Sequence, residues 1–189
     1  MRSSGSPRGT AGRRRPWPLL ALLLGLALVS GHGAEAQTPD CAVLERLAGT
    51  WIGRGSLQRH LLSGTEPLRC RLDSDWKAAH AELISRWDCR GVDGDLTFAG
   101  ALAETGSGSR VSGTLEASQG LEAGVLAGRC ETDAVALDLS GWNPTTRDPV
   151  AASLTISLSE DDRTLTTTIE ARDPDSGEWF TALTIRFVR

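Results

Sequence analysis

The stretch LAGTWIGRG, residues 47–55, decides the fold, because the sequence pattern changes within it. The residues leading into it, CAVLERLAG at 41–49, are mostly good helix formers and end in glycine. We therefore expect a helix of about two turns, stopped by Gly49 at the C′ position. From Trp51 onward apolar and polar residues alternate, which is the period of a half-buried strand. Ordinary strand chemistry is one explanation of a Gly-x-Trp at the start of a first strand, and a second explanation depends on the rest of the chain.

The clearest alternation lies in two neighbouring segments, LRCRLDSDW at 68–76 and AELISRWDC at 81–89. Folding them back on each other through residues 77–80 places Leu72 opposite Trp87 and Cys70 opposite Cys89. A slip of one residue would turn every apolar side chain to the wrong face. Directly opposed residues also bring their Cβ atoms within reach of a disulfide. We therefore predict a Cys70–Cys89 bond, which leaves Cys41 to pair with Cys130.

The alternation continues to the C-terminus, with turn signals every eight to twelve residues. It gives about ten short strands joined mostly by hairpins. We predict one all-β domain over residues 37–189, a single antiparallel up-and-down β-barrel of about 8–10 strands with a short N-terminal helix, because closure removes exposed strand edges. A β-sandwich is the alternative, since its sequence signature is similar.

Residues 1–36 are predicted to be a signal peptide. Basic residues between Arg2 and Arg15 precede an apolar run from Leu19 to Val29, and Ala34-Glu35-Ala36 has the form of a cleavage site. The apolar run is shorter than the roughly 20 residues of a spanning helix, which disfavours the alternative of a retained anchor. All four cysteines follow residue 36, as expected in an oxidising compartment. We predict a bacterial protein of the periplasm or the exterior, exported by the general route or, as the alternative, the twin-arginine route.

The charge balance disfavours polyanionic partners. Removing residues 1–36 takes away five arginines and one glutamate and leaves fifteen basic against twenty-three acidic residues, a net charge near −8. With no basic patch evident, we expect neither nucleic acid nor an anionic membrane surface as a partner. The chain also lacks the tyrosines of an outer-membrane girdle, and polar residues such as Arg69 and Glu82 alternate with the apolar set. We expect a protein that is soluble rather than membrane-spanning, and a monomer.

With a short helix before it and a meander after it, the segment LAGTWIGRG resembles the Gly-x-Trp region of lipocalin-like, calycin-type barrels. The motifs EPLRCRL at 66–72, CR at 89–90, RVSGTLE at 110–116 and SLTISLSED at 153–161 are similar to those of a family of small exported alphaproteobacterial proteins with no assigned function. The pair Cys41 and Cys130 is an addition to that pattern. The resemblance implies a barrel and an exported location, and it implies little about chemistry.

The same resemblance implies a structural plug. In calycin-type barrels the tryptophan closes one end and is packed by a basic residue near the C-terminus. In this chain Trp179, Leu183, Ile185 and Phe187 share one parity, so Arg189 shares their inward face. We expect Arg189 to pack over Trp51, with Arg186 as the alternative and Leu44 or Leu47 beneath the ring.

Sequence motifs for catalysis are not found. The chain has no Gly-x-Ser-x-Gly elbow, no P-loop and no dinucleotide fingerprint. His60 and His80 lack a partner visible in the sequence, and we expect both to lie in solvated turns. Asp173-Pro174-Asp175-Ser176-Gly177 lacks the rest of a calcium loop and is predicted to be a turn. We therefore predict a protein that is not an enzyme and that carries no metal and no cofactor.

Two binding hypotheses remain. The first is a carrier for a small apolar molecule in the barrel interior, since a barrel of this size can hold one ligand or be packed solid. The strand around Val125 has small residues at 123, 124, 127 and 128 that leave space there. The second is a module that binds a secreted protein, such as a protease or lysozyme inhibitor, through the loop Trp142–Pro149. The predicted ligand-lining residues are Trp51, Leu72, Trp87, Phe98, Leu102, Leu115, Leu137 and Ile156.

Overall fold

The computed structural model describes residues 41–106, 108–117, 124–143 and 147–189, all within the unit that begins at Gln37. The proposed signal peptide lies outside these residues. In the described ranges no helix is both long enough and apolar enough to cross a membrane. The elements in chain order are α1 (Ala42–Arg46), β1 (Gly49–Gln58), β2 (Thr65–Lys77), the 3-10 turn η1 (Ala78–His80), β3 (Glu82–Arg90), β4 (Asp95–Glu104), β5 (Arg110–Ala117), β6 (Gly124–Cys130), β7 (Ala134–Trp142), β8 (Pro149–Leu158), β9 (Thr164–Arg172) and β10 (Trp179–Val188).

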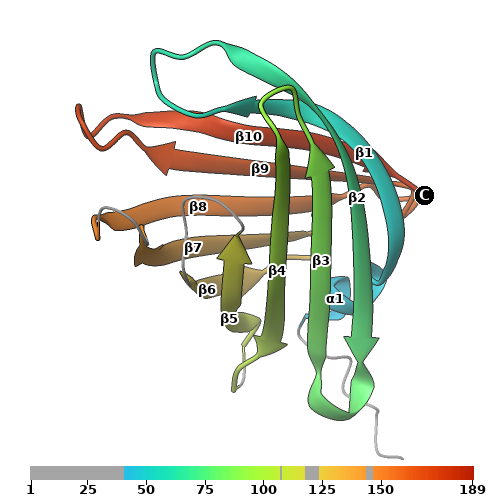
Figure 1. Ribbon diagram of the computed structural model, residues 1–189. Coiled ribbons are helices and arrows are strands. Elements are labelled where there is room, and N and C mark those ends of the chain that lie inside the picture. Colours follow the sequence, from blue (N-terminus) through green and yellow to red (C-terminus); the bar gives the residue numbers. More distant parts are fainter. Residues whose placement is uncertain (1–40, 107, 118–123, 144–146) are drawn as a thin grey trace, which may run out of the picture. The chain divides into compact units, whose positions relative to one another are not determined.

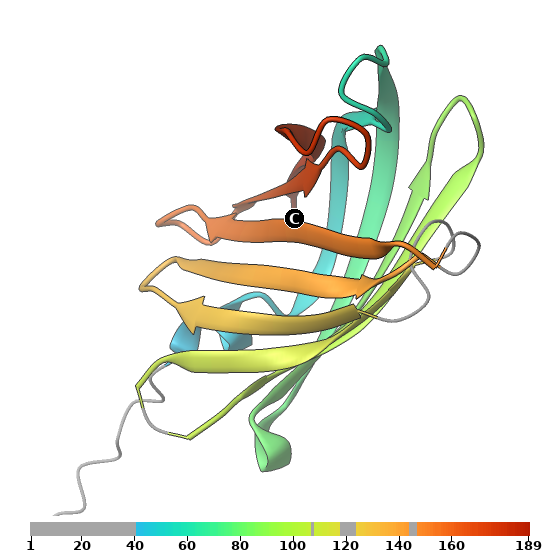
Figure 2. The same ribbon diagram turned by 90° about the vertical axis from the view of Figure 1, so that its left-hand side faces the viewer.

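The ten strands form one closed antiparallel barrel, as Figures 1 and 2 show. Each strand pairs with its neighbours in sequence, and β1 closes the ring by pairing with β10, with Ile52 opposite Val188. The predicted up-and-down barrel is therefore confirmed and the sandwich is excluded. Closure leaves no strand with an unpaired edge, which is how such a fold avoids edge-to-edge association.

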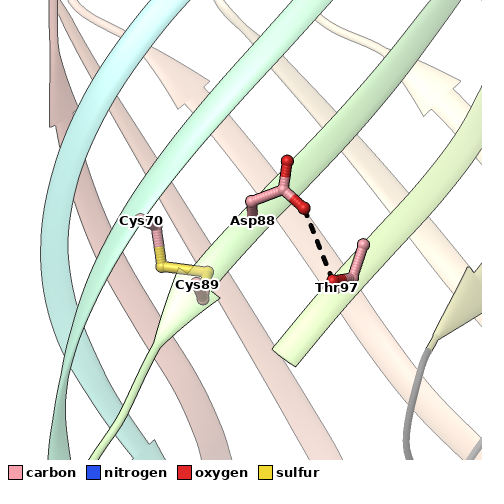
Figure 3. The surroundings of a disulfide bond; sticks show 4 residues. All are labelled: Cys70, Asp88, Cys89 and Thr97. Carbon is pink, nitrogen blue, oxygen red and sulfur yellow. Dashed lines mark hydrogen bonds between the residues drawn. A yellow bond between two sulfur atoms is a disulfide. The ribbon is translucent and has the colours of Figure 1, made fainter. Parts of the chain in front are cut away.

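The predicted register between β2 and β3 is confirmed. Leu72 lies opposite Trp87 and Cys70 opposite Cys89, across the turn formed by η1. The Cα atoms of Cys70 and Cys89 are 4.0 Å apart and their sulfurs are bonded (Figure 3). The second disulfide joins Cys41, before α1, to Cys130 at the end of β6. Both are the pairs that the sequence predicts.

The glycines of the opening stretch allow β1 to approach β10 closely. A Cβ atom on Gly53 would lie 2.5 Å from the ring of Phe187, and one on Gly55 would lie 1.9 Å from the carbonyl oxygen of Thr184. Phe187 is fully buried, so the absent side chain at Gly53 makes the room that this ring fills. Gly53-Arg54-Gly55 therefore serves packing at the seam where the barrel closes.

Two local predictions are wrong. The helix spans only Ala42–Arg46, and Gly49 is the first residue of β1, with φ of +125°, rather than the C′ residue of the helix. On β6 the inward residues are Gly124, Leu126 and Gly128, while Val125 is 60 % exposed. Pairing with β5 and β7 fixes this parity, because Leu126 lies opposite buried Leu139. Leu126 fills part of the space that the small residues were expected to leave.

The barrel has two unlike ends. One end of the barrel is the end at which β1, β3, β7 and β9 terminate, and we call it the mouth. The other end, where β2, β4, β6 and β8 finish and where α1 lies, we call the closed end. Inward-facing apolar residues from all the strands fill the barrel between these ends as one continuous core.

Candidate functional site

The space inside the middle of the barrel is small. A cavity of about 40 Å³ remains between the inward side chains. A water molecule needs roughly 10–15 Å³, so this cavity has room for a few waters and is too small for an organic ligand. Two of the eight predicted lining residues, Trp51 and Leu137, are buried in the core and do not line it. The six that do are Leu72, Trp87, Phe98, Leu102, Leu115 and Ile156.

A larger space opens at the mouth. Its volume is about 470 Å³, within the range of roughly 300–1,000 Å³ that is usual for small-molecule sites. Its wall is mainly apolar and is contributed by β1, β4, β5, β7, β8, β9 and β10. The larger side chains of this wall are Leu57, Leu96, Phe98, Leu115, Leu139, Val150, Ile169, Phe180 and Leu183.

An aromatic cluster lies within the barrel beneath the mouth. The ring of Trp87 meets Phe98 edge-to-face at a centroid distance of 5.9 Å and meets Phe187 in the same way at 5.7 Å. Such pairs add about 0.5–1.5 kcal/mol beyond the area that they bury. Phe98 and Leu115 line both the small cavity and the mouth, so they form part of the wall between the two spaces.

Polar groups at the mouth come from the rim. Gln58, Arg59, His60 and Asn143 join the apolar side chains around the opening. The side-chain nitrogen of Gln58 donates to the carbonyl oxygens of His60 and Leu61, which holds the β1–β2 connection in shape. His60 is exposed at the mouth and His80 is exposed at the other end of the barrel, as expected for turns. The arrangement suits a ligand with an apolar body and a polar end that remains near water.

Asp173 ties two rim connections together. Its carboxylate accepts hydrogen bonds from the backbone N–H groups of Asp175 and Ser176 in its own turn, and from the N–H of Leu61 across the rim. The side chain is buried, unlike most aspartates. The hydrogen bond from the Ser176 N–H is the largest of several that hold the pKa of Asp173 below its usual value. The predicted turn at 173–177 is thus present, and its carboxylate serves the architecture of the rim.

The rim also carries exposed apolar side chains. Leu62 is 96 % exposed, Val92 75 %, Trp142 58 % and Trp179 56 %. They come from the β1–β2 and β3–β4 connections, the end of β7 and the start of β10, all at the mouth. The predicted protein-binding loop after Trp142 lies here too, with residues 144–146 outside the described ranges.

The closed end is sealed around Trp51. This side chain is fully buried, and its indole N–H donates to the carbonyl oxygen of Leu47 at 3.0 Å. The guanidinium carbon of Arg189 lies 4.0 Å from the centre of its ring. Leu44 is also fully buried. The predicted stacking of Arg189 on Trp51 is confirmed, and Arg186 instead points outward as an exposed residue.

Ion pairs fix the closed end further. Arg46, at the end of α1, donates to the carboxylates of Asp133 and Asp162, at 2.7 Å and 2.5 Å, and these raise its pKa. Arg189 donates to the carbonyl oxygens of Arg46 and Asp162. The connections β6–β7 and β8–β9 are thereby bound to the helix. No sequence pattern indicated a role for Arg46, because its acidic partners Asp133 and Asp162 lie far away along the chain.

Comparisons with known proteins support the fold. No family model matches the chain, and no curated protein matches its sequence. Among solved structures, it is similar to Rv2717c from M. tuberculosis, with 20 % identity, a TM-score of 0.60, and coverage of 80 % of this chain and 98 % of that one. It is also similar to the S-type phycobiliprotein lyase CPES from Guillardia theta, with 13 % identity, a TM-score of 0.50, and coverage of 78 % and 90 %. These likenesses support the fold, a closed antiparallel β-barrel, and extend no further than the fold.

Proposed function

We propose that the chain is an exported carrier that binds a small apolar ligand in the mouth of the barrel. The observation that carries the proposal is the contrast between the two spaces, about 470 Å³ at the mouth and about 40 Å³ inside. Only the first suits an organic molecule. We therefore assign to the ligand the residues that line the mouth. Of the eight lining residues predicted from the sequence, Phe98 and Leu115 belong to this group.

The rim supports a ligand with one polar end. Burial of an apolar body against Leu57, Leu139 and Ile169 contributes about 25 cal/mol per Å² removed from water. A polar end then lies near Gln58 or His60, where it remains hydrated or accepts a hydrogen bond. We propose binding without catalysis, because the described mouth residues offer no nucleophile held by a base.

Two disulfides support export. Such bonds persist in oxidising compartments and are rare in the bacterial cytosol. Together with the basic and apolar pattern of residues 1–36, they are consistent with a protein of the periplasm or the exterior.

A second candidate function is binding of another secreted protein. The observation that favours it is the exposure of Trp142, Trp179 and Leu62 on one rim, since exposed aromatic residues are frequent anchors at interfaces. In this alternative the rim would act as the contact surface and the mouth would hold a partner side chain.

Native mass spectrometry of the protein, purified from the compartment to which it is exported, tests the proposal. We expect an added mass of lipid size that dissociates when the protein is unfolded. Protein that carries no added mass and binds no fatty acid after incubation would contradict the carrier function. A stoichiometric protein partner recovered in its place would favour the second candidate.

A further inference from the structure

Four arginines form a row on the outer wall of the barrel, which reaches the mouth end of β3 at Arg90. Arg186 on β10 lies opposite Arg54 on β1, Arg54 opposite Arg69 on β2, and Arg69 opposite Arg90 on β3. All four are exposed, and directly opposed residues share one face of a sheet. The sequence-based expectation that no basic patch exists is therefore wrong. The four arginines are far apart in the sequence, and the barrel register brings them together.

The row carries an excess of positive charge, since a single acidic residue, exposed Asp95 on β4, lies opposite one of its members, Arg90. Like charges directly opposite each other destabilise a sheet. In the described part of the chain, none of the four guanidinium groups forms an ion pair, whereas the neighbouring Arg71 and Arg86 are paired with Asp73 and Asp88. The whole chain has a net charge of −4, so the row stands out against an acidic background. This concentration of positive charge is complementary to an anion.

The geometry of the row selects the kind of anion. Neighbouring strands lie about 4.8 Å apart, so the backbone positions of the four arginines follow one another across the wall at short intervals. The wall belongs to a closed barrel and curves, so a flat membrane would meet only part of the row. A flexible chain with several acidic groups can follow the curve and use all four arginines.

The next row of residues on the same face indicates which kind of acidic polymer fits. Exposed Ile52 lies opposite exposed Val188, each two residues from an arginine of the row. These aliphatic side chains offer a contact to apolar groups but no flat surface on which nucleotide bases stack. Polyphosphates have no apolar side chains to place there. A peptide with both acidic and aliphatic residues has the matching groups.

We propose that the outer face of β10, β1, β2 and β3 binds an acidic, partly aliphatic segment of a partner protein. Its carboxylates pair with Arg186, Arg54, Arg69 and Arg90, and its aliphatic side chains contact Ile52 and Val188. Guanidinium groups suit carboxylates because both are planar and pair through two parallel hydrogen bonds. This site is separate from the mouth, so a ligand can occupy the barrel while the wall is bound.

Fluorescence anisotropy with a short labelled peptide of glutamate and leucine tests the site at low salt. We expect the double variant Arg54→Glu with Arg69→Glu to weaken binding by at least about tenfold, because attraction becomes repulsion at two adjacent positions. The matched control is Arg110→Glu with Arg129→Glu. These two exposed arginines are directly opposed on β5 and β6, and the control makes the same change in net charge. We expect the control to change affinity by less than about threefold.

Other outcomes would overturn the proposal. Equal weakening by both double variants would assign the binding to net charge alone. Tighter binding of single-stranded DNA or polyphosphate than of the peptide would assign the face to another class of polymer. If binding is unchanged when glutamine replaces the glutamates of the peptide, the arginines do not recognise its carboxylates. The milder double variant Arg54→Gln with Arg69→Gln changes only side chains that point outward, and circular dichroism checks that it is folded. It must also bind the peptide more weakly than the wild type does.

Discussion

The closed end and the mouth of this barrel differ in how their side chains are packed and paired. At the closed end a buried tryptophan, a stacked arginine, an ion-pair network and a disulfide bind the helix to two β-turns. At the mouth the same strands leave an open apolar space, and large apolar side chains of the rim lie in water. One end of the fold supplies stability, which allows the other end to remain open.

The largest expected effect is at the closed end. Replacing Trp51 with alanine should lower the free energy of unfolding by about 3–5 kcal/mol, because it removes a fully buried aromatic side chain. The matched change at the mouth, Trp142→Ala, removes a side chain that is 58 % exposed and should cost less than about 1 kcal/mol. Urea unfolding of both variants measures this difference. Equal losses would break the division of roles between the two ends.

The two disulfides should contribute unequally to the free energy of unfolding, and the one at the closed end should contribute more. The bond Cys41–Cys130 closes a loop of 89 residues and should contribute about 4.5 kcal/mol through chain entropy. The bond Cys70–Cys89 closes a loop of 19 and should contribute about 3 kcal/mol. Urea unfolding of the two double alanine variants gives both values. A larger loss on removing the shorter bond would show that local packing outweighs loop entropy.

A smaller effect is expected for the ion pairs. Arg46→Ala should lower the free energy of unfolding by about 1–2 kcal/mol, since charge-assisted hydrogen bonds to two partly exposed carboxylates are lost. The control at the mouth is Arg172→Ala, which loses one hydrogen bond to the carbonyl oxygen of Gly177. Thermal unfolding at low and high salt should show a loss for Arg46→Ala that shrinks as salt is added. A salt-independent loss would point to packing of its aliphatic stem instead.

The smallest effect is confined to the rim. The pKa of Asp173 is lowered on folding, so the hydrogen bonds that it accepts stabilise the rim above its unfolded pKa and are lost as pH falls through the folded value. The protection of the Leu61 amide, taken relative to the intrinsic exchange rate at each pH, should therefore fall in acid, below the ordinary pKa range of an aspartate. In Asp173→Asn the exchange of this amide should already be fast at neutral pH and should lose its dependence on that titration. If the Leu61 amide is as well protected in the variant as in the wild type, Asp173 does not hold the two connections together.

Local patterns in the sequence predicted much of the fold and less of the site. Alternation and opposed cysteines were sufficient for the β2–β3 register, because both are properties of adjacent segments. Parity along β10 was sufficient for Arg189 on Trp51. The division of the interior into a small cavity and a wider mouth was not predicted, because it depends on how far Trp87, Phe98 and Phe187 fill the interior. The parity of β6 was also missed, since its apolar residues occupy consecutive positions and only pairing with its neighbours decides which face turns inward.

Under the proposed function the ligand lies in the mouth, and not at the closed end or on the wall. Ala152 lines the mouth, and Ala151, its neighbour on β8, points outward and is exposed. Titration of each phenylalanine variant with a fluorescent fatty acid tests the claim directly, with Ala171→Phe as a second mouth-filling variant should the first fold poorly. We expect Ala152→Phe to weaken binding by at least about tenfold and Ala151→Phe to bind as the wild type does. Equal affinity in all of these variants would contradict this placement of the ligand.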